Sequence, residues 1–176
     1  IKGSIGCQGL DMESAQGDRA IVSLLEEFGA ETKMILNQIT VTNKEMKGIR
    51  IDASQIPDLV PILCIAGAAA EGTTEITNAG RLRMKESDRL AVMAECLKKI
   101  GVEVEEREDG LVITGGCNPP EGEIVIDSHN DHRIVMAAAI AALKCRGDVI
   151  IKGAEAAEKS YPTFFDDYTR LGGKAY

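Results

Sequence analysis

Tryptophan is absent from this chain of 176 residues, and aromatic residues make up only 3% of it. Isoleucine, leucine, valine, alanine and methionine must therefore fill the core, and a hydrophobic fraction of 44% is sufficient for one domain of ordinary size. No stretch of 18 apolar residues and no signal peptide occurs, which argues against a membrane protein. The chain begins with Ile1 rather than methionine, and we interpret it as a fragment of a longer protein.

Cysteine motifs are lacking as well. Five cysteines are scattered along the chain and no C-x-x-C occurs. An odd number of widely separated cysteines, several of them in apolar helical patterns, is typical of reduced thiols. We therefore expect a cytoplasmic protein in which these residues are free thiols: Cys7, Cys64, Cys96, Cys117 and Cys145.

Positive charge is in short supply. The formal net charge is -8 and the isoelectric point is near 4.9. An acidic chain of this size is a poor candidate for binding nucleic acid or anionic membranes. Any anionic ligand must be held by a local cluster of cations, so the places where cations gather are the most informative about function.

An internal repeat is present. Ile51-Asp52 recurs as Ile126-Asp127, 75 residues later. Each pair is followed by an alanine-rich segment that predicts a helix, then by a β-rich segment, and then by a lysine. The corresponding stretches are helices over 59–70 and 134–142, strands over 73–77 and 148–152, and the lysines Lys85 and Lys159.

A second match extends the repeat towards the start of the chain. Asp18-Arg19 and Asp88-Arg89 each open a helical pattern that ends at a glycine and leads into two β-rich segments. The predicted elements are helices over 20–29, 90–101 and 164–171, and strands over 32–36, 38–42, 102–106 and 111–114. One complete unit is therefore strand, helix, strand, helix, strand, strand, or βαβαββ.

Three such pseudo-repeats divide a single domain at about residues 1–47, 48–121 and 122–176. The first lacks its opening strand and helix, and the third covers most of a unit. The helices over 59–70 and 134–143 are apolar and rich in small residues, which lets helices approach closely. The sequence thus predicts an α/β domain whose sheets pack around these inner helices.

The expected helix ends carry suitable capping residues. Polar residues that can accept from free backbone N–H groups precede three helices, and glycines follow three. The candidate N-caps are Asp18, Ser87 and Asp131, and the glycines are Gly29, Gly101 and Gly172.

Arg89 is unusual because it stands in the first turn of a predicted helix, where the helix dipole disfavours a positive charge. A cation at this place is better explained if an anion binds, since helix N-termini also offer free N–H groups. The alternative is a solvated, charged turn in which Ser87 or Asp88 serves only as the cap.

The third unit repeats this arrangement. Arg133 again lies in the first turn of a helix, and equivalent elements of two repeats come to the same end of a domain. Four cations are expected to gather there: Lys85, Arg89, Arg133 and Lys159. Such a cluster in an acidic chain predicts a site for phosphate and carboxylate groups. Arg19 also follows an aspartate at a helix start, and we interpret it as a surface residue.

Asp58 follows Ile56-Pro57 at the start of the first inner helix, and the 75-residue repeat makes it the equivalent of Arg133. It is therefore predicted to lie at the same end as the cations. Neighbouring cations would keep its carboxylate ionised and suited to act as a general base. The alternative is that Asp58 is an ordinary N-cap.

Metal binding is not predicted. His129 and His132 form an H-x-x-H pair, but no cysteine or further histidine cluster accompanies them.

Five motifs together resemble the C-terminal part of the 5-enolpyruvylshikimate-3-phosphate synthase family. They follow one another in the family's order and cover the chain nearly from end to end. They are Gln-Gly-Asp (16–18), Ile-Pro-Asp (56–58), Lys-Glu-Ser-Asp-Arg (85–89), Asn-Asp-His-Arg (130–133) and Lys-Ser-Tyr-Pro (159–162). The related UDP-N-acetylglucosamine enolpyruvyl transferase shares the fold but lacks this combination. The resemblance implies an enolpyruvyl transferase-like inside-out α/β barrel domain, one of two in the enzyme, with the active site between them.

The resemblance also implies a reaction. The family transfers the enolpyruvyl group of phosphoenolpyruvate to the 5-hydroxyl of shikimate 3-phosphate and releases phosphate, in aromatic amino acid biosynthesis. It uses no metal and no organic cofactor. Glyphosate occupies the phosphoenolpyruvate position in this family, so the same cations are expected to hold it.

Site residues follow from the same resemblance. Asp58 matches the base that takes the proton from the 5-hydroxyl and also binds the shikimate ring. Glu86 matches the carboxylate that transfers a proton to the enolpyruvyl methylene. Lys85 matches a lysine that bridges the two substrates, and His132 matches a histidine that supports the site. The phosphoenolpyruvate clamp is matched by Arg89, Arg133 and Lys159.

Two departures from the family pattern limit these assignments. Arg81 stands where some members have asparagine, so we assign it no role. The N-terminal domain is missing, and with it a catalytic lysine, the serines that grip the shikimate phosphate and an arginine on phosphoenolpyruvate. We therefore expect this chain alone to be inactive. The alternatives are a different enolpyruvyl transferase, marked by a cysteine in an N-terminal-domain loop, and a non-enzymatic interaction domain.

Overall fold

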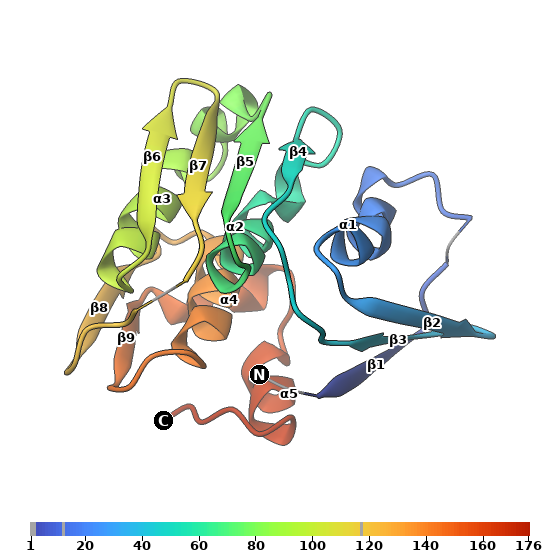
Figure 1. Cartoon of the computed structure of the whole chain (residues 1–176). Coiled ribbons are helices and arrows are strands. Elements are labelled where there is room, and N and C mark those ends of the chain that lie inside the picture. Colours follow the sequence, from blue (N-terminus) through green and yellow to red (C-terminus); the bar gives the residue numbers. More distant parts are fainter. Residues whose placement is uncertain (1–2, 12, 117) are drawn as a thin grey trace.

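Three separate sheets form the outer layer of the domain in a computed structural model, which describes residues 3–11, 13–116 and 118–176 (Figure 1). Their strand orders are β1-β3-β2, β4-β5-β7-β6 and β8-β9. The elements are β1 (Ser4–Gln8), η1 (Gly17–Ala20), α1 (Ile21–Glu27), β2 (Glu31–Ile35), β3 (Gln38–Thr42), β4 (Arg50–Asp52), η2 (Pro57–Leu59), α2 (Val60–Ala69), β5 (Thr73–Thr77), η3 (Gly80–Met84), α3 (Arg89–Lys99), β6 (Glu103–Arg107), β7 (Gly110–Thr114), β8 (Ile124–Asp127), α4 (His132–Ala142), β9 (Val149–Lys152), η4 (Ala154–Lys159) and α5 (Phe164–Arg170), where η denotes a 3-10 helix.

The middle of the chain forms a complete βαβαββ unit. β4 pairs with β5 in parallel, and the β6–β7 hairpin adds to β5 in antiparallel fashion through β7. Parallel strands need a crossover, and α2 supplies it. Ile51, Ile76 and Leu111 are paired across three strands of this sheet and are almost completely buried, which fixes the register against the inner helices.

The other two sheets contain parts of the same unit. In the sheet of the first unit, β1 pairs with β3 as β5 pairs with β7, and equivalents of β4 and α2 do not precede it among the described residues. The third unit has β8, α4 and β9 in the order of β4, α2 and β5, followed by η4 and α5. The strand bounds of β1 escaped the sequence analysis, because all five of its residues are exposed.

The inner helices were predicted correctly. α2 packs against α4 and is buried on nearly every side, and the two helices lie next to each other in Figure 1. Small residues permit this close packing. A Cβ on Gly67 would lie 2.9 Å from Cβ of Thr74 on β5, closer than normal contact allows.

The helix N-termini correct two predictions and confirm one. Asp131 caps α4 as predicted, since its carboxylate accepts a hydrogen bond from a backbone N–H in the first turn. Asp88, not Ser87, caps α3, because it accepts from the backbone N–H of Ala91 at 3.1 Å. Asp18 is not a cap either, since it lies inside η1, whose start has no side-chain capping bond.

The C-termini agree with the sequence. Gly29, Gly101 and Gly172 have φ angles of 104°, 77° and 101°, which is the left-handed region that glycine adopts without a Cβ clash.

The described cysteines are thiols, as the sequence predicted. Cys7, Cys64, Cys96 and Cys145 are thiols rather than disulfides, and Cys117 lies outside the described residues. Burial raises the pKa of Cys64 and raises that of Cys96 to about 12, so neither is a nucleophile at neutral pH. Among the described helices, none is long and apolar enough to cross a membrane.

Candidate functional site

Three of the predicted cations converge on the carboxylate of Asp58. Arg89 Nη1 donates to Asp58 Oδ1 at 2.8 Å, and Lys85 Nζ lies 3.3 Å from the same oxygen. Arg133 Nη2 lies 3.3 Å from Oδ2, while its Nη1 donates to the backbone oxygen of Asp58 at 3.0 Å. We call these four residues the Asp58 cluster.

Helix starts position this cluster. Asp58 lies in η2, which leads directly into α2, and Pro57 begins that 3-10 turn with its φ angle already fixed. Arg89 is the first residue of α3, and Arg133 is the second residue of α4. The start of three helices therefore adds partial positive charge to that of the side chains, which favours an anion.

The cluster holds Asp58 in its ionised form. Partial burial raises its pKa, but Arg133, Arg89 and Lys85 outweigh this effect, so the pKa of Asp58 lies below its ordinary value. Its side chain is 34% exposed, and a ligand can therefore reach it. Asp58 accepts no capping bond from a backbone N–H at the start of η2, so the interpretation as an ordinary N-cap is wrong.

The buried carboxylate of Asp131 fixes the position of Arg89. Its Nε and Nη2 donate to the two oxygens of Asp131 at 2.8 and 3.2 Å, a fork that fixes the guanidinium plane. Arg89 is 2% exposed and Asp131 is completely buried, so the alternative of a solvated turn is wrong for Arg89. Ser87 Oγ donates to Asp131 Oδ2 at 3.0 Å. Burial raises the pKa of Asp131, but the bonds from Arg89 outweigh it, so the pKa of Asp131 lies below its usual value.

The remaining predicted residues form a second group beside this pair. Glu86 Oε2 lies 3.1 Å from Nδ1 of His132 and 3.9 Å from Nζ of Lys159. Lys159 also donates to the backbone oxygen of Asn130 at 2.6 Å. Asp131 adjoins both groups, because His132 follows it in the chain and Ser87 bonds it. The structure thus brings together all seven residues that the sequence selected.

Two further arginines were considered in the sequence analysis, and both are exposed. Arg19 is exposed on η1, as predicted, and Arg81 is exposed on η3. Glu86, Asp131 and His132 each place a potential metal-ligand atom within 4.8 Å of the others. However, Arg89 and Ser87 already donate to the oxygens of Asp131, so this group is organised around protein donors.

Sequence reasoning missed the link between Arg89 and Asp131. Both residues were noticed, but 42 residues separate them and the capping role alone explained Asp131. The signal that could have indicated this bond is Asp131 itself, a carboxylate that stands two residues before Arg133.

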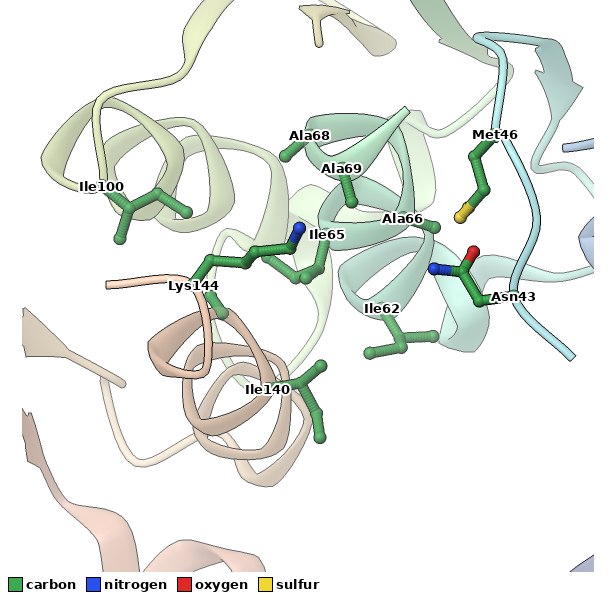
Figure 2. Close-up of a pocket in the computed structure, with 11 residues that line it drawn as sticks. Asn43, Met46, Ile62, Ile65, Ala66, Ala68, Ala69, Ile100, Ile140 and Lys144 are labelled. Atoms are coloured by element: carbon green, nitrogen blue, oxygen red, sulfur yellow. The ribbon is translucent and has the colours of Figure 1, made fainter. Parts of the chain in front are cut away.

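Two apolar hollows lie elsewhere. One, of about 250 Å³, opens between α2 and α4, where Ile62 and Ile140 line its sides (Figure 2). The other, of about 680 Å³, is lined by parts of β1, α4 and α5, including Ile5, Leu143 and Phe164. Few polar groups line either hollow, so neither suits a phosphate or carboxylate ligand.

The comparison with protein families bears on this cation site. A sequence model described as EPSP synthase (3-phosphoshikimate 1-carboxyvinyltransferase) matches residues 1–168. The chain belongs to the EPSP synthase family. The resemblance indicated by the five motifs is thereby confirmed.

Individual relatives of the EPSP synthase family agree. A 3-phosphoshikimate 1-carboxyvinyltransferase of Clostridium novyi is 50% identical over 164 residues, which cover 93% of this chain and 37% of that relative. The structure of EPSP synthase from Acinetobacter baumannii matches with a TM-score of 0.86 and 31% identity, over 98% of this chain and 42% of that one. The chain therefore spans about two fifths of the length of these relatives.

A more distant structure supports the fold alone. The enolpyruvyl transferase NikO from Streptomyces tendae matches with a TM-score of 0.73 at 23% identity, over 89% of this chain and 37% of that one. The expected inside-out α/β architecture, with helices inside and sheets outside, is confirmed.

Proposed function

We propose that this chain is the C-terminal domain of a 3-phosphoshikimate 1-carboxyvinyltransferase and forms one wall of its active site. The whole enzyme transfers the enolpyruvyl group of phosphoenolpyruvate to the 5-hydroxyl of shikimate 3-phosphate and releases phosphate, in the pathway to aromatic amino acids. The observation that carries the proposal is the Asp58 cluster, in which three cations meet one carboxylate in an otherwise acidic member of this family.

Asp58 acts as the general base in this proposal. Its carboxylate is ionised and accessible, so it can accept the proton of the 5-hydroxyl as the oxygen attacks the second carbon of phosphoenolpyruvate. A base held by three cations is weak. Anionic substrates would draw the cations towards themselves and thereby raise the pKa of Asp58 at the moment when it must accept a proton.

The cations hold the substrate anions. Arg89 and Arg133 offer planar, forked donors that suit carboxylate and phosphate oxygens, whereas Lys85 and Lys159 act as mobile point charges. Lys85 reaches towards both substrates. Holding two phosphates and a carboxylate in the correct orientation can lower the activation barrier by several kcal/mol. The upper limit for well-oriented reactants is about 7–11 kcal/mol.

Glu86 is the proposed acid. As the 5-hydroxyl oxygen bonds to one carbon, the neighbouring methylene carbon takes a proton from Glu86, and the reverse transfer accompanies loss of phosphate. His132 contacts Glu86 at 3.1 Å and supports its orientation, while Lys159 lies on its other side. Metals and organic cofactors play no part in these steps.

The partner of this domain is the N-terminal domain of the same enzyme, in our proposal. It supplies the opposite wall of the cleft, with a catalytic lysine, the serines for the shikimate phosphate and an arginine for phosphoenolpyruvate. The chain itself is one domain with units at about 1–47, 48–121 and 122–176. Glyphosate binds in place of phosphoenolpyruvate, and the enzyme works in the cytoplasm without nucleic acid or membrane partners.

The test is a steady-state assay of phosphate release. We expect the full-length protein to release phosphate only when both phosphoenolpyruvate and shikimate 3-phosphate are present, and this chain alone to give no measurable turnover. The missing wall removes transition-state contacts worth many kcal/mol. Phosphate release without shikimate 3-phosphate, or near-native turnover by this chain alone, would contradict the proposal.

A further inference from the structure

A hairpin outside the site holds the loop that carries Lys85 and Glu86. This loop, residues 85–88, runs between η3 and α3, and Arg83 is the penultimate residue of η3, just before the loop. Arg83 Nη1 donates to Asp88 Oδ2 at 2.9 Å, at the far end of the loop, and to Glu106 Oε1 on β6 at 2.9 Å. One guanidinium therefore joins both ends of the loop to the β6–β7 hairpin.

The rest of the guanidinium grips the backbone of that hairpin. Nε donates to the carbonyl oxygen of Glu108 and Nη2 to that of Arg107, both at 2.7 Å. Nearby, the backbone N–H of Ala79 donates to the carbonyl oxygen of Asp109, also at 2.7 Å. Every nitrogen of Arg83 is thus engaged, and its side chain is only 28% exposed.

Asp88 transmits this restraint to the site. Its carboxylate caps α3 by accepting from the N–H of Ala91, so the group held by Arg83 also fixes where α3 begins. The next residue is Arg89. In the described part of the chain, the hydrogen bonds of Arg83 reach the hairpin and Asp88 but none of the Asp58 cluster.

We propose that Arg83 is a positioning residue, which holds the 85–88 loop against the β6–β7 hairpin so that Lys85 and Glu86 meet their substrates. The identity of the substrates rests on the proposed function, but the restraint of the loop by Arg83 does not depend on it. Lysine cannot replace Arg83, because a single ammonium cannot donate to two backbone oxygens and two carboxylates in fixed directions.

Kinetics of full-length variants test the catalytic consequence. A displacement of about 1 Å in a reacting group can cost about 100-fold in rate, so Arg83→Met is expected to lower kcat/KM by about 10- to 100-fold, with KM for phosphoenolpyruvate raised. The matched control is Arg107→Met, which removes an arginine of the same hairpin whose side chain bonds Glu75 and Glu105 instead. It should stay within about 2-fold of the wild type.

A double variant separates positioning from general destabilisation. If Arg83 acts through Lys85, then Arg83→Met should cost much less in a Lys85→Met background than in the wild type. Arg83→Lys should not restore kcat/KM. Equal losses in both backgrounds, or kcat/KM of Arg83→Met within about 2-fold of the Arg107→Met control, would overturn the inference.

Hydrogen exchange gives a readout that does not depend on turnover. In full-length protein, Arg83→Met should speed exchange of the Ala91 amide and its neighbours in the first turn of α3, whereas Arg107→Met should not. Unchanged exchange in Arg83→Met would overturn the restraint on the loop. An inactive wild type would instead overturn the proposed function, and exchange would still decide whether Arg83 holds the loop.

Discussion

At the scale of single residues, the buried pair of Arg89 and Asp131 dominates the site. A buried ion pair adds little to stability relative to apolar residues, but removing one partner leaves an unpaired charge. Asp131 also accepts bonds from Ser87 and from the first turn of α4, so one carboxylate joins the loops of two units. Its loss should therefore affect both stability and site geometry.

We expect Asp131→Asn to lower the free energy of unfolding by about 3–5 kcal/mol at pH 7. Because the folded pKa of Asp131 lies below its unfolded value, the stabilisation is present above about pH 4 and is lost as the pH falls through the folded pKa. The free energy of unfolding of Asp131→Asn should therefore fall less steeply than that of the wild type as the pH is lowered. Urea unfolding between pH 3 and 7 would measure both effects, with Asp166→Asn, at an exposed position, as the control. An equal loss in both variants would contradict the expectation.

Asp58 provides the residue-scale test of catalysis. In the full-length enzyme, Asp58→Ala should lower kcat by about 100- to 10,000-fold if Asp58 is the general base that we propose. Arg19→Ala should leave kcat nearly unchanged, because Arg19 is exposed on η1. Steady-state phosphate release would measure both variants. Comparable losses would mean that the base has been assigned to the wrong residue.

At the scale of elements, the close contact of the inner helix α2 with its sheet explains why a small residue is needed at one position. α2 touches β5 closely at Gly67, and Thr74 opposite is completely buried. A glycine inside an exposed helix would be a weakness, but here the missing side chain is what lets the helix reach the sheet.

Gly67→Ala should therefore destabilise the domain, contrary to the usual gain from replacing glycine in a helix. The added Cβ would lie 2.9 Å from Thr74 Cβ, so the packing must shift, and we expect a loss of about 1–3 kcal/mol. Gly3→Ala is the control, since no atom lies within 4 Å of the added Cβ, and it should change stability by less than about 0.5 kcal/mol. Thermal unfolding of both variants would decide, and a gain in Gly67→Ala would disprove the tight contact.

Most elements could be predicted from the sequence because each repeats a local pattern. The inner helices and both hairpins were found within a residue or two, and the repeat placed the four cations together. β1 could not be bounded, since its exposed residues show no apolar alternation. The cap of α3 was misassigned because Ser87 and Asp88 are both good caps, and only three-dimensional geometry distinguishes them. The Arg89–Asp131 bond lies outside any local pattern.

At the scale of the whole molecule, the domain presents two kinds of open surface. The cation site is charged and accessible, since Glu86 and Lys159 are each about 40% exposed. The hollow beside α2 and α4 and the one beside α5 are apolar. The domain nevertheless has a large core of its own, because buried residues of α2 and α3 and one face of α4 form one cluster.

This chain alone should fold but bind ligands weakly. Its core is largely local, so a dispersed NMR spectrum is expected. Phosphoenolpyruvate or glyphosate should bind with a dissociation constant well above micromolar, because ion pairs open to water contribute only about 0–1 kcal/mol each. Titration of the labelled chain would measure this. Micromolar binding without shikimate 3-phosphate would mean that the site is already preorganised, and a spectrum without dispersion would mean that the domain needs its partner to fold.

The pairing of Asp58 with Arg133 has a consequence for how such a site can arise by duplication. These residues occupy equivalent positions in two units, 75 residues apart, yet they carry opposite charges and bond each other. If these two positions carried the same charge, as an exact repeat of either residue would require, the contact between the two units would be repulsive. A change of sign in one copy converts that repulsion into attraction. It also leaves one carboxylate among several cations, so the departure from exact repetition is what makes this end of the domain chemically asymmetric.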